Sequence, residues 1–259
     1  MELTSPFMYF CTHCNYQHKA TLQHIMKGQL YLIPNTLGDS PIERNLPKET
    51  IEIIRSIKHY VVENIRSARR FLKKVDKSIE IDDLTFYVLD KHTNPNDIPD
   101  YLKPAFDGKN LGLLSEAGCP GVADPGADVV KLAHDKKIRV IPLVGPSSIL
   151  LSVMASGLNG QSFAFNGYLP LKKGEVGKFI KHLEDRSIRE KQTQLFIEAP
   201  YRNIKLLQEL LQACRPQTQL CIACDITLET EFIQTKTIAQ WKSKLPDINK
   251  RPAIFLILG

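Results

Sequence analysis

The sequence predicts an α/β protein of two domains, and three features of the chain support that prediction. Short apolar runs, typical of buried strands, alternate with segments whose apolar residues recur every three or four positions, as on one face of a helix. The 259 residues exceed a typical single domain of about 100 to 150 residues. A composition of 43% hydrophobic and 24% charged residues is that of a globular protein and excludes a disordered chain.

The first half reads as strands and helices in alternation. Strands are predicted at residues 30–33, 60–62, 86–89, 111–115 and 138–144. Three segments show helical spacing. The first covers residues 48–74 on both sides of the second strand, the second starts after Asp124 and Pro125, and the third covers residues 148–157. Residues 91–99, rich in Asn, Asp and Pro, are expected to form a loop. This order is typical of a parallel sheet covered by helices.

The second half has the same class of elements in a different order. Strands are predicted at 195–198, 220–224, 231–237 and 253–258, and helices at 204–213 and around Trp241. No charged residue occurs from Val140 to Leu171, and because this stretch is broken by Pro and Gly we expect it to lie between domains rather than in a membrane. The predicted division is a leader at 1–25, an N-terminal domain at 26–145 and a C-terminal domain at 146–259.

Charge and cysteine usage point to a cytoplasmic protein with reduced thiols. The net charge of +6 is compatible with an anionic partner such as RNA. The chain contains two C-x-x-C pairs, Cys11 with Cys14 and Cys221 with Cys224. The stretch between the two pairs is far longer than the roughly 15 to 20 residues of a zinc ribbon, so no metal site is expected. The odd spacing of Cys221 and Cys224 on a strand sends their thiols to opposite faces. Residues 1–25 lack the pattern of a signal peptide.

Three loops rich in Gly, Pro and Ser follow predicted strands, namely PNTLGD at 34–39, SEAGCPG at 115–121 and VGPSS at 144–148. Ligands of open α/β sheets bind at the carboxyl ends of the strands, and glycine lets a backbone approach a ligand closely. Ser147 and Ser148 open a helix whose free amides suit an anion. Tight turns without a ligand are the alternative. The chain lacks the G-x-G-x-x-G, Walker A and G-x-S-x-G motifs, which disfavours dinucleotide enzymes, P-loop NTPases and α/β-hydrolases.

Ordered motifs along most of the chain after Met26 carry a resemblance to a known family. These are LYLIPNTLGD, ENIRSARRFL, LGLLSEAGCPGVADPG, IRVIPLVGPSS, FAFNGYLP and IEAPYR. They resemble the bacterial small-subunit ribosomal RNA cytidine 2′-O-methyltransferases, a branch of the tetrapyrrole methylase superfamily. The resemblance implies S-adenosylmethionine bound in a cleft between two α/β domains, ribosomal RNA or the small ribosomal subunit as partner, and a homodimer without a membrane anchor.

The same resemblance implies which residues contact the cofactor. They come from three loops of the first domain and two segments of the second: Pro34, Leu37, Gly38, Ser115, Glu116, Ala117, Gly118, Val144, Gly145, Pro146, Ser147, Phe165, Asn166, Glu198, Ala199 and Pro200. Asn64 stands where the family's EDTR motif has an acidic residue, and Tyr201 stands where a histidine is usual. These departures bear on the substrate more than on the cofactor.

Methyl transfer to a hydroxyl depends on alignment and benefits from a nearby base or polarising group. Glu63, Arg66 and Glu116 are the candidates for that role, with a loop hydrogen bond or a helix ion pair as the structural alternative. Four cations recur at helical spacing and are candidates for binding RNA phosphates: Arg66, Arg69, Arg70 and Lys73. The alternative is that they form only the solvated face of a helix. A methyltransferase of the tetrapyrrole or diphthine type, and a binding protein without catalysis, are the other functions to test.

Overall fold

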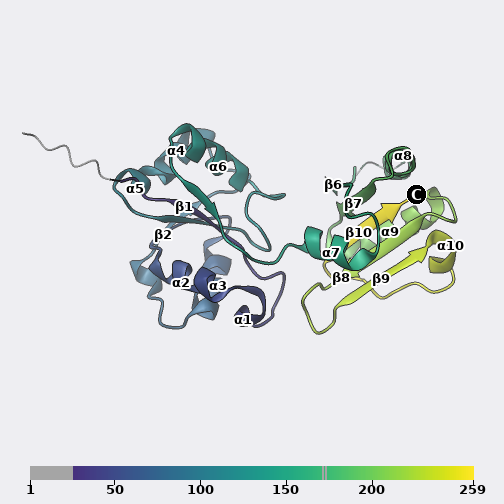
Figure 1. The fold of residues 1–259 in the computed structure, drawn as a ribbon, viewed down its shortest axis with the longest axis horizontal. Helices are drawn as coiled ribbons and strands as arrows, with labels where there is room; N and C mark the ends of the chain where they lie inside the picture. The colour runs from purple at the N-terminus through teal and green to yellow at the C-terminus, as the bar shows by residue number, and fades with distance from the viewer. Residues whose placement is uncertain (1–25, 171, 173) are drawn as a thin grey trace, which may run out of the picture.

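The computed structural model describes residues 26–170, 172 and 174–259, which form two five-stranded sheets with helices packed on both faces (Figure 1). The two sheets lie side by side along the long axis of the molecule and are joined next to the helix α7 (Ser148–Ser156). This confirms the predicted two-domain α/β class. The leader at 1–25, with Cys11 and Cys14, lies outside the described residues.

The first sheet is parallel throughout, as predicted. Its strands lie in the order β3-β2-β4-β1-β5. They are β1 (Leu30–Ile33), β2 (His59–Val62), β3 (Thr85–Val88), β4 (Leu111–Leu114) and β5 (Val140–Pro142). The central strand β4 is buried along its whole length, which explains its continuous apolar sequence LGLL. All five carboxyl ends meet at one edge of the sheet.

Helices cover both faces of this sheet (Figure 1). On one face pack α1 (Ile42–Asn45), α2 (Lys48–Ser56) and α3 (Ile65–Val75), and on the other α4 (Ile98–Tyr101), α5 (Lys103–Phe106) and α6 (Gly126–Asp135). Two 3₁₀ turns, Ile81–Asp83 and Pro95–Asp97, connect them. The loop prediction for 91–99 is therefore partly wrong, since Pro95 and Pro99 occupy first-turn positions where proline favours helix.

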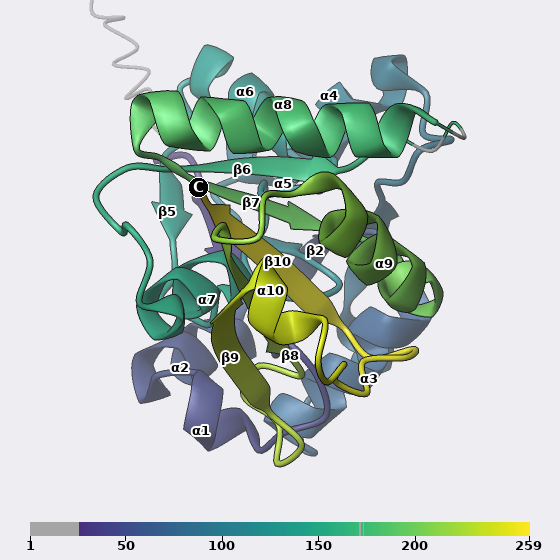
Figure 2. The same ribbon diagram turned by 90° about the vertical axis from the view of Figure 1, so that its right-hand side faces the viewer.

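The second sheet is mixed, in the order β6-β7-β10-β8-β9 (Figure 2). Its strands are β6 (Phe163–Tyr168), β7 (Thr193–Ile197), β8 (Gln219–Cys224), β9 (Phe232–Thr237) and β10 (Ala253–Leu258). Only β6 and β7 are parallel, whereas β10 runs antiparallel to both its neighbours and β8 antiparallel to β9. Strands and helices still alternate along this half of the chain, except that β9 follows β8 directly, but the strands do not run parallel throughout.

One face of the second sheet packs against α8 (Glu175–Glu190), α9 (Asn203–Ala213) and α10 (Ile238–Trp241), and the other against α7. A 3₁₀ turn at Pro200–Arg202 precedes α9. Cys224 lies in the first of these clusters and Cys221 in the cluster with α7, which confirms that their side chains lie on opposite faces. Both thiols are free.

Within residues 26–170, 172 and 174–259, no helix is both long enough and apolar enough to cross a bilayer. The same part of the chain contains no group of three or more His, Cys, Asp or Glu side chains arranged to hold a metal ion.

Candidate active site

Two adjoining cavities lie between the sheets, at the carboxyl edge of the first sheet. The first has a volume of about 340 Å³ and the second about 290 Å³. Both are lined by Ala117 from the loop after β4, by Ser148 at the start of α7, and by Tyr168, Ile197 and Ile254 from the second sheet. Together the cavities form one cleft whose size suits a small organic ligand.

Asn35 joins two of the loops predicted to form the site. The side chain is 8% exposed, and its amide nitrogen donates hydrogen bonds to the carbonyl oxygens of Ser115 and Glu116, each at 3.1 Å. Its backbone also pairs with Gly118 in both directions, at 2.9 and 3.1 Å. Gly118 adopts a φ of +68°, which favours glycine, and the Ser115 hydroxyl donates to its carbonyl oxygen at 2.7 Å. Residues 34–38 and 115–118 are thus held as one unit.

The third loop is packed directly against the first. A Cβ atom on Gly145 would lie 2.2 Å from Cγ of Pro34, so this glycine is required by packing and not by ligand access. Ser147 caps α7 by accepting a hydrogen bond from the amide of Leu150. Ser147 and Ser148 both line the first cavity, so the amino terminus of α7 lies at the cleft.

The structure brings nine of the predicted cofactor residues to the cavities: Leu37, Ser115, Glu116, Ala117, Gly118, Ser147, Phe165, Glu198 and Pro200. It does not bring Pro34, Gly38, Val144, Gly145, Pro146, Asn166 or Ala199 to their walls. Gly38 faces Leu228, since a Cβ there would lie 2.9 Å from a methyl group of that side chain. The carboxylate of Glu198 is held by Arg202 at 2.5 Å and by the amide of Ala199 at 2.7 Å.

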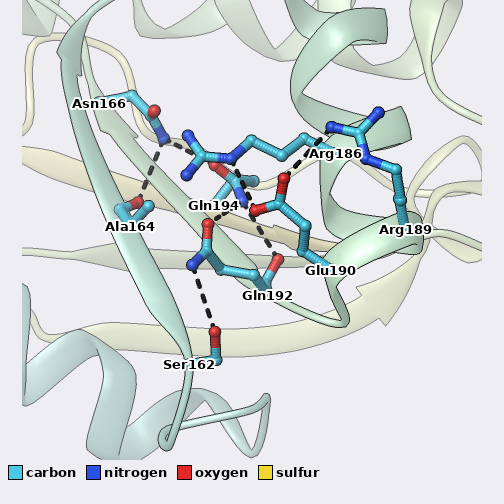
Figure 3. A network of polar contacts seen from close by, with 8 residues as sticks. All are labelled: Ser162, Ala164, Asn166, Arg186, Arg189, Glu190, Gln192 and Gln194. Atoms are coloured by element: carbon cyan, nitrogen blue, oxygen red, sulfur yellow. Dashed lines mark hydrogen bonds and ion pairs between the residues drawn. The ribbon is translucent and has the colours of Figure 1, made fainter.

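Asn166 belongs to a polar network on the second sheet (Figure 3). Its amide donates to the carbonyl oxygens of Ala164 and Leu195, both at 3.1 Å, and to the side chain of the fully buried Gln194 at 3.2 Å. Gln194 in turn donates to Gln192 at 2.9 Å. These contacts tie β6 to β7, and they account for Asn166 without a ligand.

Three carboxylates, Glu63, Glu116 and Asp124, line the first cavity. Glu63 follows β2 and is half-buried, and its pKa is raised by burial and then by the charges of Asp124 and Glu116, with a backbone hydrogen bond from Glu116 in partial opposition. Asp124 accepts from the amides of Gly121 and Gly126, both at 2.8 Å, while burial raises its pKa. Glu116 accepts from the hydroxyl of Ser67 at 2.5 Å. Glu63 is therefore the carboxyl best suited to exchange a proton.

Arg66, the remaining catalytic candidate, lines neither cavity. It is exposed on α3 with Arg69 and Arg70, and Lys73 on the same helix is half-buried. Among the described residues, no carboxylate forms an ion pair with any of these four side chains, whereas Lys74 pairs with Asp39 at 2.5 Å. We define the α3 basic face as Arg66, Arg69, Arg70 and Lys73.

Comparison with known proteins identifies the family. No model of a known protein family matches the chain. A Streptococcus pyogenes protein described as ribosomal RNA small subunit methyltransferase I is 30% identical over 232 residues, which cover 90% of this chain and 76% of the relative. The chain belongs to the ribosomal RNA small subunit methyltransferase I family. It is therefore a methyltransferase, and the resemblance found in the sequence is confirmed.

Other comparisons agree with this family and with the fold. A ribosomal RNA small subunit methyltransferase I from Vibrio cholerae is 25% identical over 234 residues, covering 89% of this chain and 77% of that protein. A crystal structure of the methyltransferase CobJ superposes with a TM-score of 0.58 over 90% of this chain and 94% of that one, at 16% identity. At that identity the likeness establishes the fold alone.

Several cavity residues were not singled out from the sequence. Tyr168 lies inside a motif that the sequence did highlight, and Asp124 was assigned only to the start of a helix. The rest of the second cavity comes from the ends of β8 and β10: Ala223, Asp225, Ile226, Pro252, Ala253 and Ile254. No local signal marks these residues, because they reach the cleft only through antiparallel pairing of distant strands.

Asn64, the departure from the family pattern, retains a structural role in this methyltransferase. It is the N-cap of α3, and its side-chain oxygen accepts from the amides of Arg66 and Ser67 at 2.9 and 3.2 Å. We expect Asn64→Ala to lower the free energy of unfolding by about 1 kcal/mol and Asn64→Asp to leave it nearly unchanged, since both Asn and Asp cap helices well. Urea denaturation of the three proteins measures this, and equal loss in both variants would contradict it.

Proposed function

We propose that this methyltransferase transfers a methyl group from S-adenosylmethionine to a sugar 2′-hydroxyl of ribosomal RNA. The observation that carries the proposal is the position of the half-buried Glu63 carboxylate in a cleft that the loop at 115–118, the start of α7 and the second sheet also line. Membership in a family named for ribosomal RNA methylation supports the substrate class. The cytoplasm, where ribosomes are assembled, is the expected location, and a homodimer is the expected assembly.

The cleft residues fit S-adenosylmethionine in size and chemistry. The amides at the start of α7, beside Ser147 and Ser148, suit the carboxylate of the methionyl group. The second cavity is mainly apolar, with Ala223 and Ile226 on its wall, which suits an adenine ring. When bound, the cofactor supplies an electrophilic methyl group on a sulfonium, which leaves as a neutral thioether.

Glu63 acts as the proton acceptor for the acceptor hydroxyl. As the oxygen forms its bond to the methyl carbon, its proton passes to the Glu63 carboxylate, which becomes a neutral carboxylic acid. Burial and the neighbouring charges of Asp124 and Glu116 raise the pKa of Glu63, which makes it a stronger base than an exposed glutamate. Ser67 fixes Glu116 through its hydroxyl, which orients this wall of the cleft.

The α3 basic face binds the phosphates that flank the acceptor nucleotide. Its helix begins directly after Glu63 and Asn64, so its cations lie next to the first cavity, without carboxylate partners among the described residues. The guanidinium of Arg69 lies 5.7 Å from the ring centroid of Phe86, which positions that side chain on the surface.

We expect the double variant Arg69→Ala, Arg70→Ala to weaken RNA binding and to reduce the slope of log affinity against log salt by about 1 to 2. Cofactor affinity should not change, because neither residue lines a cavity. Filter binding at several salt concentrations measures the slope. The matched control is the double variant Lys178→Ala, Lys181→Ala, which removes two exposed cations of α8. An equal change in slope in this control would contradict the assignment.

The decisive experiment supplies methyl-labelled cofactor with undermodified small ribosomal subunits, total RNA or a metabolite extract. Label on the 2′-oxygen of a ribosomal RNA nucleotide supports the proposal. Label only in metabolites identifies a small-molecule methyltransferase instead, and cofactor binding without any transfer identifies a binding protein. A protein that does not bind S-adenosylmethionine, measured by calorimetry, overturns the assignment of the cleft.

A further inference from the structure

A β-bulge at the end of β6 turns one aromatic side chain into the cleft. Phe165 pairs with Leu195 and Tyr168 pairs with Ile197, so three steps along β6 match two steps along β7. Gly167, inside this irregularity, adopts a φ of +63°, a conformation that favours glycine. Bulges of this kind redirect a side chain and are common beside active sites.

The extra residue decides which face of the sheet Tyr168 occupies. Side chains alternate along a strand, so Tyr168, three residues after Phe165, would otherwise lie on the opposite face, where Asn166 bonds to Gln194 (Figure 3). With the bulge, Phe165, Tyr168 and Ile197 all line the first cavity. The strand therefore gives up one regular pairing position to present an aromatic ring to the ligand.

The ring of Tyr168 is largely free of protein contacts. The residue is 62% exposed, although it is a large aromatic side chain, and it lines both cavities. It therefore lies at the border between the carboxylate-lined first cavity and the apolar second cavity. Among the described residues no protein group forms a hydrogen bond with its hydroxyl, so both the ring face and the hydroxyl are free to contact a ligand.

We propose that Tyr168 is a substrate-positioning residue that stacks on the nucleobase of the acceptor nucleotide. This inference rests on the proposed function, since it assigns the part of the first cavity beside Glu63 to the acceptor. A base attached to the sugar that meets Glu63 must lie close to that cavity, and proteins hold unpaired RNA bases by stacking them on aromatic rings. The acceptor nucleotide would consequently enter the cleft unstacked from its RNA neighbours.

The test compares Tyr168→Ala with Tyr168→Phe, which keeps the ring. We expect Tyr168→Ala to raise the KM for undermodified small-subunit ribosomal RNA by about 5- to 150-fold, the effect of losing one base stack. Tyr168→Phe should stay within about 2-fold of the wild type, because the ring face is retained. The dissociation constant for S-adenosylmethionine, measured by calorimetry, should change by a much smaller factor in Tyr168→Ala than the KM for RNA does.

Three other results overturn the inference. An equal loss of cofactor affinity in Tyr168→Ala would assign the ring to the cofactor site, and a defect in Tyr168→Phe as large as in Tyr168→Ala would assign the function to the hydroxyl. Met154→Ala, which removes an apolar side chain that is 78% exposed on α7 and lines neither cavity, is the control, and an equal rise in KM would show a non-specific surface effect. If the wild type binds cofactor but does not methylate RNA, the proposed function itself fails.

Discussion

Glu63→Gln is expected to lower kcat for RNA methylation by about 10²- to 10⁴-fold, the contribution of a positioned general base. The amide has nearly the shape of the carboxylate but cannot accept the proton. The dissociation constants for cofactor and RNA should change little, because the residue acts on the hydroxyl proton. Single-turnover kinetics with saturating cofactor measure the effect. Glu52→Gln, which removes an exposed carboxylate from α2, is the matched control and should retain full activity.

The pH dependence gives a second readout of Glu63. The ionised carboxylate is the active form, so kcat should fall as pH decreases through its pKa, which burial and the charges of Asp124 and Glu116 raise above the ordinary 4.5. Glu116→Gln removes one of these charges and should shift the acidic limb of the profile to lower pH. A profile with the same acidic limb in Glu63→Gln as in the wild type would contradict the assignment.

Folding stability should move in the opposite direction to activity. Because the pKa of Glu63 is raised in the folded state, the folded protein holds that proton more tightly than the unfolded chain does. Its contribution to stability is thus fully present below the unfolded pKa and is lost as pH rises through the folded pKa. We expect Glu63→Gln to melt at the same temperature as the wild type or higher at neutral pH, which separates lost catalysis from misfolding.

Asn35→Ala is expected to damage both the fold and the cofactor site. It leaves the buried carbonyl oxygen of Ser115 and the part-buried carbonyl oxygen of Glu116 without their side-chain donor, and the buried amide of Thr36 without its acceptor. Each unsatisfied buried group costs about 1 to 3 kcal/mol, so we expect the free energy of unfolding to fall by about 2 to 4 kcal/mol. The affinity for S-adenosylmethionine should fall about 10-fold or more, because the loop at 115–118 loses its fixed geometry.

Asn110→Ala is the control for Asn35→Ala. Asn110 accepts a hydrogen bond from the amide of Gln29 at 3.0 Å, at the amino end of β4 and away from the cleft. Its loss should reduce stability by about 1 kcal/mol and leave cofactor affinity unchanged. Chemical denaturation and calorimetry measure both quantities. Equal cofactor affinity in Asn35→Ala and the wild type would show that the loop does not depend on this side chain.

The first sheet was predictable from the sequence, whereas the pairing in the second was not. Buried parallel strands such as β1 and β4 are continuous apolar runs, and the helices between them show regular spacing. The strands of the second sheet were also visible, but β10 pairs with β7 and β8, which are separated from it by long stretches of chain. Strand order of this kind depends on tertiary packing that no local pattern records.

Half of the site was predictable for a related reason. The loops at 34–39, 115–121 and 144–148 follow parallel strands, so their meeting at one edge is a consequence of the topology. Their glycines do not all serve a ligand, because Gly145 makes room for Pro34, while Gly118 adopts a φ of +68° and lies against the side chain of Leu37. A glycine that packing requires and a glycine that ligand access requires look the same in the sequence. Only the positions of the neighbouring atoms distinguish the two. The predicted contact at Asn166 faces the polar network of β6 and β7 in the structure.

The central place of β10 has a consequence for how the chain is made. In the sheet order β6-β7-β10-β8-β9, the strand that comes last in the chain occupies the middle. During synthesis the first domain, whose strands all precede residue 143, can fold as it emerges, as domains generally do. In the second domain, β7 and β8 each pair with β10, so one edge of each strand stays unpaired until β10 has been synthesised. Until then these edges are open to association with other chains. Synthesis of β10, and not the appearance of the catalytic loops, is therefore the step that completes the cleft.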